Sequence, residues 1–255
     1  MANLESIYGS EHPVALVTGA GAARVGNAIA LRLADMGFQL AIHFNQSEQG
    51  ALQTVASIES QGGQAHSFQA NLGDGQSEAD LITQVVDRFS RLDVVVNSAA
   101  IWNAKSLEET TVADVEDHWR LNNLAVYLIC QQAGLQMVGQ DSGGAIINIG
   151  DWATIRPYLN YSAYFSAKGS VASITRSMAV ELSSRNNRIR VNAVLPGPVM
   201  VPQSIVGDER QRIVDGTLLK REGSPDHVAH AVQFLVENDF VTGVAIPVDG
   251  GRTLA

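Results

Sequence analysis

Cysteine is nearly missing from this sequence, since Cys130 is the only one among 255 residues. A single thiol excludes intrachain disulfides, CxxC redox chemistry and zinc sites built from several thiolates. His227 and His230 are three residues apart, but no further cluster of His, Cys or carboxylate residues completes a metal site in the sequence. We interpret them as part of a solvated helix face, and we expect no metal centre.

Positive charge is scarce as well. The chain has 17 Lys and Arg against 26 Asp and Glu, which gives a formal net charge of −9. Such a surface attracts neither nucleic acid nor an anionic membrane, so the expected partner is a small-molecule substrate. The motifs GxSxG and HExxH and the P-loop lysine are also absent, which leaves hydrolase and kinase functions without support.

Long hydrophobic runs are missing too. The first residues lack the basic start and the apolar core of a signal peptide. The longest uncharged stretch, residues 121–140, is interrupted by several Asn and Gln residues. This pattern favours a helix buried inside a protein over a membrane span. We therefore expect a cytoplasmic protein.

Short apolar runs alternate with helical patterns along nearly the whole chain. The runs that predict strands are 14–18, 40–44, 65–69, 93–97, 145–149, 189–194 and 244–248. Most lack polar alternation, so helices should cover both faces of a parallel sheet. The predicted fold class is α/β: a single-domain, Rossmann-like, doubly wound sheet of about seven strands over residues 13–255. Residues 1–12 are predicted to be a flexible N-terminal segment.

Proline interrupts this alternation of strands and helices after the sixth predicted strand. Pro196 ends the strand, and the long connection 197–220 is predicted to be a substrate loop or lid that contains a helix-like segment, Asp208–Leu219. A second break, at Ser224 and Pro225, has the residue types of a helix start.

A glycine cluster follows the first predicted strand and opens a helical pattern. Gly19, Gly21 and Gly26 allow a tight turn and a close backbone approach. A pyrophosphate can then rest on the N-terminus of the helix that begins near Val25. The turn predicts a dinucleotide site.

The end of the second strand should set the choice of dinucleotide. An acidic residue at this place would hold a ribose 2′-hydroxyl and select NAD. This sequence instead has Asn45 and Ser47, which can donate hydrogen bonds. Arg24, in the glycine turn, can meet a 2′-phosphate with its charged fork. The predicted cofactor is NADP(H).

Tyr164 and Lys168 are four residues apart in a helical pattern that follows the fifth strand. That spacing places both side chains on one helix face. An ammonium near a phenol favours the phenolate, so we expect Lys168 to lower the pKa of Tyr164. Such a tyrosine can give a proton to a carbonyl or imine as a hydride arrives.

Taken together, these motifs resemble the short-chain dehydrogenase/reductase family over nearly the full length of the chain. Further matches are Asn97-Ser98-Ala99-Ala100, Asn122, Pro196-Gly197 and Val248-Asp249-Gly250-Gly251. The resemblance implies that Tyr164 is the general acid/base. It also implies that Lys168 holds the nicotinamide ribose and that Asn122 positions a water of the proton relay.

The resemblance also implies where a dinucleotide would lie and how copies of the chain would assemble. Beyond the glycine turn, the expected NADP(H) contacts are Asn71, Leu72, Asn97, Ala99, Tyr164, Lys168, Pro196, Gly197 and Val199. Trp119 and Tyr127 lie on the helical pattern 112–137 and are expected to be packing or subunit-interface residues. Because the family commonly forms tetramers through such helices, a homotetramer is expected.

One departure from the family pattern concerns chemistry. Asp151 stands thirteen residues before Tyr164, where the family usually has a serine. With Arg24 in the turn and Trp102 after the fourth strand, this resembles the pteridine reductases and dihydromonapterin reductases. A pterin has ring N–H groups that suit a carboxylate, and Trp102 could stack on its flat ring system.

The first expectation is therefore hydride transfer from NADPH to a C=N bond of a dihydropteridine, with Asp151, Tyr164 and Trp102 at the substrate. Asp151 could instead be a structural carboxylate that caps a turn, and Trp102 an ordinary residue of the cleft wall. Two other functions stay open. One is the NADPH-dependent reduction of a carbonyl group, such as a 3-ketoacyl or sugar ketone, and the other is a non-catalytic NADPH-binding or sensing module.

Overall fold

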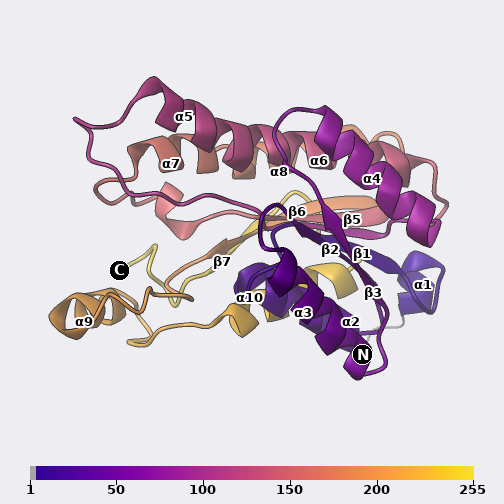
Figure 1. Ribbon diagram of the computed structural model, residues 1–255, viewed down its shortest axis with the longest axis horizontal. Coiled ribbons are helices and arrows are strands. Elements are labelled where there is room, and N and C mark those ends of the chain that lie inside the picture. The colour runs from indigo at the N-terminus through magenta and orange to yellow at the C-terminus, as the bar shows by residue number, and fades with distance from the viewer. Residues whose placement is uncertain (1–3) are drawn as a thin grey trace.

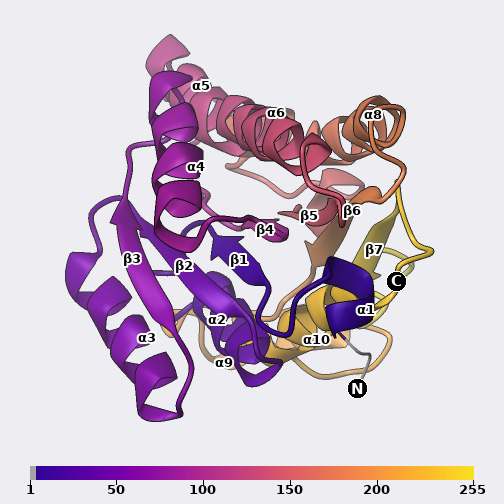
Figure 2. The ribbon, with the colours of Figure 1, turned by 90° about the vertical axis from the view of Figure 1, so that its right-hand side faces the viewer.

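The structure, a computed structural model, describes residues 4–255. Seven parallel strands form one sheet in the order β3-β2-β1-β4-β5-β6-β7 (Figures 1 and 2). They are β1 (Val14–Val17), β2 (Gln39–Phe44), β3 (Ala65–Gln69), β4 (Val94–Asn97), β5 (Gly144–Ile149), β6 (Ile189–Pro196) and β7 (Ala245–Val248). The predicted single-domain, doubly wound α/β fold is confirmed. The strand order reverses between β1 and β4, which is where such sheets bind ligands at their carboxyl edge.

Helices cover both faces of the sheet (Figure 1). One layer contains α2 (Val25–Asp35), α3 (Glu48–Ser60) and α10 (Pro225–Glu237), and the other contains α4 (Gln76–Phe89), α6 (Ala125–Val138) and α8 (Val171–Ser183). Successive residues of β1 show why its sequence is apolar throughout. Ala15 and Val17 pack into one hydrophobic core, and Val14 and Leu16 pack into the other.

The predicted helical stretch 112–137 is not continuous. It consists of α5 (Val112–Trp119), a π-helical turn (Arg120–Leu124) and α6. A π-helical turn widens the backbone by one residue, and such turns are frequent at functional sites. This one lies beside α7 (Ser162–Lys168), the helix that carries Tyr164 and Lys168.

The prediction of a flexible segment at residues 1–12 is wrong for the part that the structure describes, and residues 1–3 lie outside it. Leu4–Tyr8 form helix α1. Tyr8 is only 1% exposed, and its hydroxyl donates a hydrogen bond of 2.9 Å to the carbonyl of Val236. Arg91 donates to the carbonyl of Tyr8 at 2.6 Å. These partners are distant in sequence, so the local pattern could not reveal them.

The connection 197–220 contains one helix, α9 (Gly207–Asp215), which lies beyond the carboxyl edge of the sheet (Figure 1). The predicted helical segment Asp208–Leu219 is too long, because the helix gives way at Gly216 to a turn in which Thr217 donates to the carbonyl of Val214. Every residue of α9 is at least partly exposed. Within residues 4–255, no helix is long and apolar enough to cross a membrane.

Candidate active site

Three close packing contacts form the glycine turn between β1 and α2. Gly19 has a φ of +68°, and a Cβ atom there would lie 2.8 Å from the Cα atom of Ala99. A Cβ at Gly21 would lie 2.7 Å from Oγ of Ser47, and one at Gly26 would lie 2.8 Å from the carbonyl oxygen of Gly19. Only glycine fits these positions. The turn therefore brings together five of the residues that the sequence predicts for the dinucleotide site.

Two residues that sequence reasoning missed support this turn from β2 and α3. His43 accepts a hydrogen bond from the backbone N–H of Gly19 at Nδ1 (3.1 Å), and its Nε2 lies 3.1 Å from the carbonyl of Ala70. Burial lowers the pKa of His43 to about 4, so the ring is neutral. A Cβ at Gly50 would overlap the carbonyl of Gly21. The sequence signal for His43 was a histidine within an otherwise apolar predicted strand.

The residues expected at the 2′-position of the ribose lie beside the turn on the surface. Arg24 is exposed at the N-cap of α2, directly before Val25. Asn45 and Ser47 are exposed as well, and Nδ2 of Asn45 donates to Oδ1 of Asn71 at 3.1 Å. Ser47 lies against Gly21 of the turn, and Arg24 stands at the N-terminus of α2, where an anion is favoured.

Two other expected cofactor contacts have side chains that point inward. Asn97 is 3% exposed, and its amide donates to Oδ1 of Asn148 at 2.8 Å. Leu72 packs into a hydrophobic core. The side chains of both residues are thus engaged in the interior of the fold, and a cofactor contact from either would come from its backbone. By contrast, Pro196, Gly197 and Val199 lie at the carboxyl end of β6 as predicted.

Asp151 and Tyr164 meet at the carboxyl edge of the sheet. The Tyr164 hydroxyl donates a hydrogen bond of 2.8 Å to Oδ2 of Asp151, which follows β5. The other oxygen, Oδ1, accepts from the backbone N–H of Ala153 at 2.8 Å and caps a short 3₁₀ turn, Trp152–Thr154. Asp151 thus serves both as a turn cap and as the partner of the tyrosine.

The electrostatics of this pair differ from the sequence expectation. Burial first, and the charge of Asp151 second, raise the pKa of Tyr164 above its ordinary value. The expected lowering of this pKa is therefore wrong for this geometry, since the hydroxyl faces a carboxylate. Burial also raises the pKa of Asp151, against the opposing effects of the Ala153 N–H, the Tyr164 hydroxyl and the charge of Lys168. Tyr164 is held in its protonated form.

Lys168 lies one helical turn from Tyr164 and is 3% exposed. Burial lowers its pKa to about 8, and the charge of Asp151 partly offsets this effect. Its ammonium is therefore the nearby positive charge that can hold a ribose hydroxyl and balance a phenolate once Tyr164 has given up its proton.

Asn122 lies in the π-helical turn and is fully buried. Its Oδ1 accepts from the backbone N–H of Ile101 at 3.1 Å, and its Nδ2 donates to the carbonyl of Ile101 at 3.0 Å. The side chain thereby fixes the loop after β4 to the turn before α6. It positions the site through backbone contacts.

Comparisons with known proteins agree with this geometry. The sequence profile of a family described as enoyl-(acyl carrier protein) reductase matches residues 19–253. The chain is 34% identical over 244 residues to a 3-oxoacyl-[acyl-carrier-protein] reductase of Synechocystis sp., covering 94% of this chain and 97% of the relative. The chain belongs to the short-chain dehydrogenase/reductase family.

Solved structures of this family are also similar. An acetoin dehydrogenase from Enterobacter cloacae superposes with a TM-score of 0.86 at 32% identity, covering 95% of this chain and 96% of that one. A blue fluorescent protein from a metagenomic library, in complex with NADPH, gives 0.86 at 30% identity, covering 94% and 97%. The chain is thus an NAD(P)-dependent oxidoreductase. The relatives named for a substrate support the family but not its narrower pteridine reductase subset.

An aromatic cluster stands at the mouth of the short-chain dehydrogenase/reductase site. Trp102 stacks on Tyr161 with ring centroids 4.8 Å apart and planes 16° apart, and its Nε1 donates to the hydroxyl of Tyr158 at 3.2 Å. Trp102 is still 42% exposed. Sequence reasoning predicted Trp102 but missed Tyr158 and Tyr161, although tyrosines at 158, 161 and 164 recur at helical spacing.

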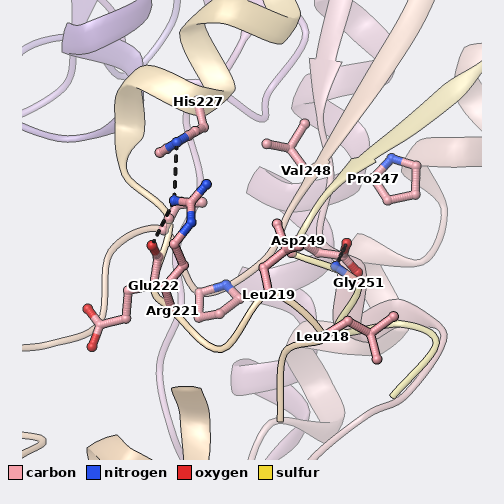
Figure 3. Close-up of a pocket in the computed structure, with 13 residues that line it drawn as sticks. Leu218, Leu219, Arg221, Glu222, His227, Pro247, Val248, Asp249 and Gly251 are labelled. Atoms are coloured by element: carbon pink, nitrogen blue, oxygen red, sulfur yellow. Dashed lines mark hydrogen bonds between the residues drawn. The ribbon is translucent and has the colours of Figure 1, made fainter. Parts of the chain in front are cut away.

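A cavity of about 400 Å³ lies between the end of β7, the N-terminus of α10 and the segment after α9 (Figure 3). Leu218, Leu219 and Val199 line it together with Arg221, whose Nη1 lies 3.5 Å from Nε2 of His227. The lining comes from residues 198–251, whereas Asp151 follows β5 and Tyr164 and Lys168 lie on α7. Val199 is the one lining residue that the sequence also predicts as a cofactor contact.

Proposed function

We propose that this protein is an NAD(P)H-dependent carbonyl reductase that converts a ketone to an alcohol. The observation that carries the proposal is the 2.8 Å hydrogen bond from Tyr164 to Asp151, which keeps the phenol protonated beside a buried lysine. A protonated phenol is the form that a reduction needs, because the carbonyl oxygen gains a proton as its carbon gains a hydride.

The residues of the glycine turn fit a dinucleotide. Gly19 and Gly21 let the turn pack closely against Ala99 and Ser47, and no side chain caps the N-terminus of α2 that follows the turn. A bound, reduced nicotinamide dinucleotide supplies the hydride. The chain supplies the rest. Asp151 holds the hydroxyl in place until the substrate binds, Tyr164 then gives up this hydrogen bond and donates its proton to the substrate oxygen, and Lys168 balances the resulting phenolate.

NADP(H) is the proposed form of the cofactor. Arg24 is the cation exposed at the start of α2, and Asn45 and Ser47, which are also exposed, precede Glu48, the first carboxylate after β2. Arg24→Ala should lower kcat/KM for NADPH about tenfold and leave that for NADH within about twofold. Arg32→Ala, on the same helix but away from the turn, is the matched control. An equal loss for both cofactors would contradict this preference.

A second candidate is reduction of a C=N bond in a dihydropteridine. Asp151 favours it, because a carboxyl group in place of a serine hydroxyl can accept a hydrogen bond from a ring N–H. The exposed indole of Trp102 also suits a flat substrate, although Tyr161 already covers one of its faces.

Turnover of a substrate panel separates these functions. Acetoin, an acetoacetyl thioester, dihydrobiopterin and dihydrofolate are each offered with NADPH and with NADH, and absorbance of the reduced nicotinamide is followed. The proposal predicts turnover of at least one ketone. Turnover of pterins alone would replace it with the second candidate, and no turnover of any compound would leave a binding module.

Asp151→Ser sharpens the same test. A hydroxyl can still donate to a ketone oxygen, so ketone turnover should stay within about tenfold of that of the unchanged protein. Dihydropteridine turnover should fall about a hundredfold, because a neutral, shorter hydroxyl replaces the charged acceptor for the ring N–H.

A homotetramer remains our proposal for the assembly. Trp119 and Tyr127, on α5 and α6, are 50% and 41% exposed, so neither is a core residue in the single chain. Large exposed aromatic side chains are enriched at interfaces. Light scattering at micromolar concentration tests this assembly, and a monomeric mass would contradict it.

A further inference from the structure

His118 is a buried histidine beside the catalytic residues that the reaction described above does not use. It lies in the last turn of α5, directly before the π-helical turn, and is 4% exposed. Its ring meets the ring of Tyr164 edge to face, with centroids 5.9 Å apart and planes 74° apart. Its Nδ1 lies 3.1 Å from Nδ2 of Asn122. One side chain therefore touches two residues of the site.

The hydrogen bonds of Asn122 decide which nitrogen of His118 carries the proton. Oδ1 of Asn122 accepts from the N–H of Ile101, so the NH₂ group is the one that faces His118. An NH₂ group only donates, and the nitrogen that it meets must accept. Nδ1 of His118 is therefore unprotonated, and the proton resides on Nε2. A hydrogen bond to the backbone of Asn103 is available to the ring as well.

The three bonds of Asn122 form one clamp. Two join the π-helical turn to the backbone of Ile101, and the third joins it to His118 one helical turn earlier. The edge-to-face contact then extends the clamp to Tyr164 on α7. A small cavity of about 60 Å³, lined in part by Lys105, Asp117 and His118, lies behind this arrangement.

We propose that His118, as the Nε2–H tautomer, is a positioning residue for proton transfer: its Nδ1 holds the amide of Asn122 and its ring edge holds the ring of Tyr164. It acts through these two residues and does not touch the reacting atoms. The inference rests on the proposed reductase function, because it concerns the geometry of the same proton donor.

Protonation of His118 would break the clamp, since Nδ1–H would then face the Asn122 NH₂ group. Burial lowers the pKa of His118 from its ordinary value of 6.5, against the charges of Asp114 and Asp117. The clamp is thus intact at neutral pH and opens in acid. The charged and titratable groups near the ring are Asp114 and Asp117 on α5, Lys105 before that helix, Tyr161 at the N-cap of α7 and Tyr164 on α7; Arg120, after α5, pairs with Asp117.

Two substitutions of equal size separate hydrogen bonding from packing. His118→Asn places an acceptor oxygen near the position of Nδ1, whereas His118→Leu has the same shape without an acceptor. The leucine variant should lose about tenfold in kcat, the effect of one lost buried hydrogen bond, with little change in KM. The asparagine variant should stay within about threefold of the unchanged protein.

The pH dependence of kcat supplies a readout that packing alone would not move. The ratio of kcat for the unchanged protein to kcat for His118→Asn should fall as pH is lowered through the acid range in which the protein stays folded, because His118 takes up a proton there and asparagine does not titrate. Equal kcat values for the leucine and asparagine variants, or a ratio that stays flat with pH, would overturn the proposal.

Nuclear magnetic resonance of ring nitrogens in the unchanged protein tests the tautomer without any variant or turnover. The chain has six histidines, and the resonance of His118 should show protonated Nε2 and unprotonated Nδ1 at pH 7. A protonated Nδ1 would overturn the clamp even if ketones are reduced. The expected tautomer together with no ketone turnover would contradict the proposed function alone.

Discussion

Two buried polar clusters lie at opposite edges of the sheet, and they differ in the groups that neutralise their buried charges. At the amino edge, Asp93 forms an ion pair of 2.7 Å with Arg91 and also accepts the N–H of Val14 at 2.8 Å. At the carboxyl edge, Asp151 accepts from a neutral phenol and a backbone N–H. Within residues 4–255, no ion pair reaches Asp151.

Arg190 belongs to the same cluster at the amino edge. Arg190 is 6% exposed, and its guanidinium donates to the carbonyls of Leu235 at 2.5 Å and Val236 at 3.1 Å, in the last turn of α10. Tyr8 donates to the same carbonyl of Val236. A cation is favoured at a helix C-terminus, so this charge is matched by the helix end that it caps.

The difference between the edges shows where the fold gains stability and where it retains reactivity. Charges at the amino edge are paired or capped. At the carboxyl edge, burial raises the pKa values of Asp151 and Tyr164 and lowers that of Lys168. Perturbed groups of this kind gather at functional sites. The two edges should therefore respond in opposite ways to substitution.

The largest expected effect is at the carboxyl edge. Tyr164→Phe removes the proton donor and should lower kcat by about 10²- to 10⁴-fold. Folding should change little, because the aromatic ring is kept and only one hydrogen bond, that to Asp151, is lost. Steady-state oxidation of NADPH and a thermal melt measure the two quantities. A variant that keeps a tenth or more of the activity would break the comparison.

The next effect is at the amino edge and has the reverse character. Arg190→Met leaves buried carbonyls at the end of α10 without their donor and should lower the free energy of unfolding by about 3 kcal/mol. The kcat per folded molecule should be unchanged. Urea denaturation measures the first quantity. Arg188→Met, two residues earlier and exposed, is the control and should change stability by less than about 0.5 kcal/mol.

Lys168 gives a smaller effect that depends on pH. Its folded pKa of about 8 lies below the unfolded value of 10.5, so the unfolded chain binds more protons between these values. Stability should therefore rise with pH in this range, by about 2 kcal/mol between pH 8 and pH 10 relative to Lys168→Met. Denaturation of both proteins across this range measures the difference, and parallel pH curves would contradict it.

Much of this arrangement could be predicted from the sequence, and the features that could not be predicted share one cause. The strands followed from apolar runs, and Gly19, Tyr164 and Lys168 followed from spacing within one segment. Whether the pKa of Tyr164 is raised or lowered depends on which side chain contacts its hydroxyl, and that side chain is Asp151. Tyr8 packs against residues more than 200 positions away. Such pairings are set by tertiary contacts that no local pattern records.

The π-helical turn shows the same limit within a single element. The pattern over 112–137 is that of one continuous helix, and no proline or glycine marks the extra residue at Arg120–Leu124. The clamp formed by His118 and Asn122 depends on that interruption. The clamp also needs Ile101, which is far from Asn122 in sequence but hydrogen-bonds to it in the fold.

The most direct test of the account is the ionisation of Tyr164 itself. The central claim is that Asp151 and burial keep this phenol protonated so that it can serve as the proton donor. The ultraviolet difference between the unchanged protein and Tyr164→Phe, followed as pH rises, isolates its phenolate. The account predicts that the Tyr164 phenolate forms only above pH 10, and that Asp151→Asn lowers this value. A phenolate that forms between pH 7 and pH 9 in the unchanged protein would contradict it.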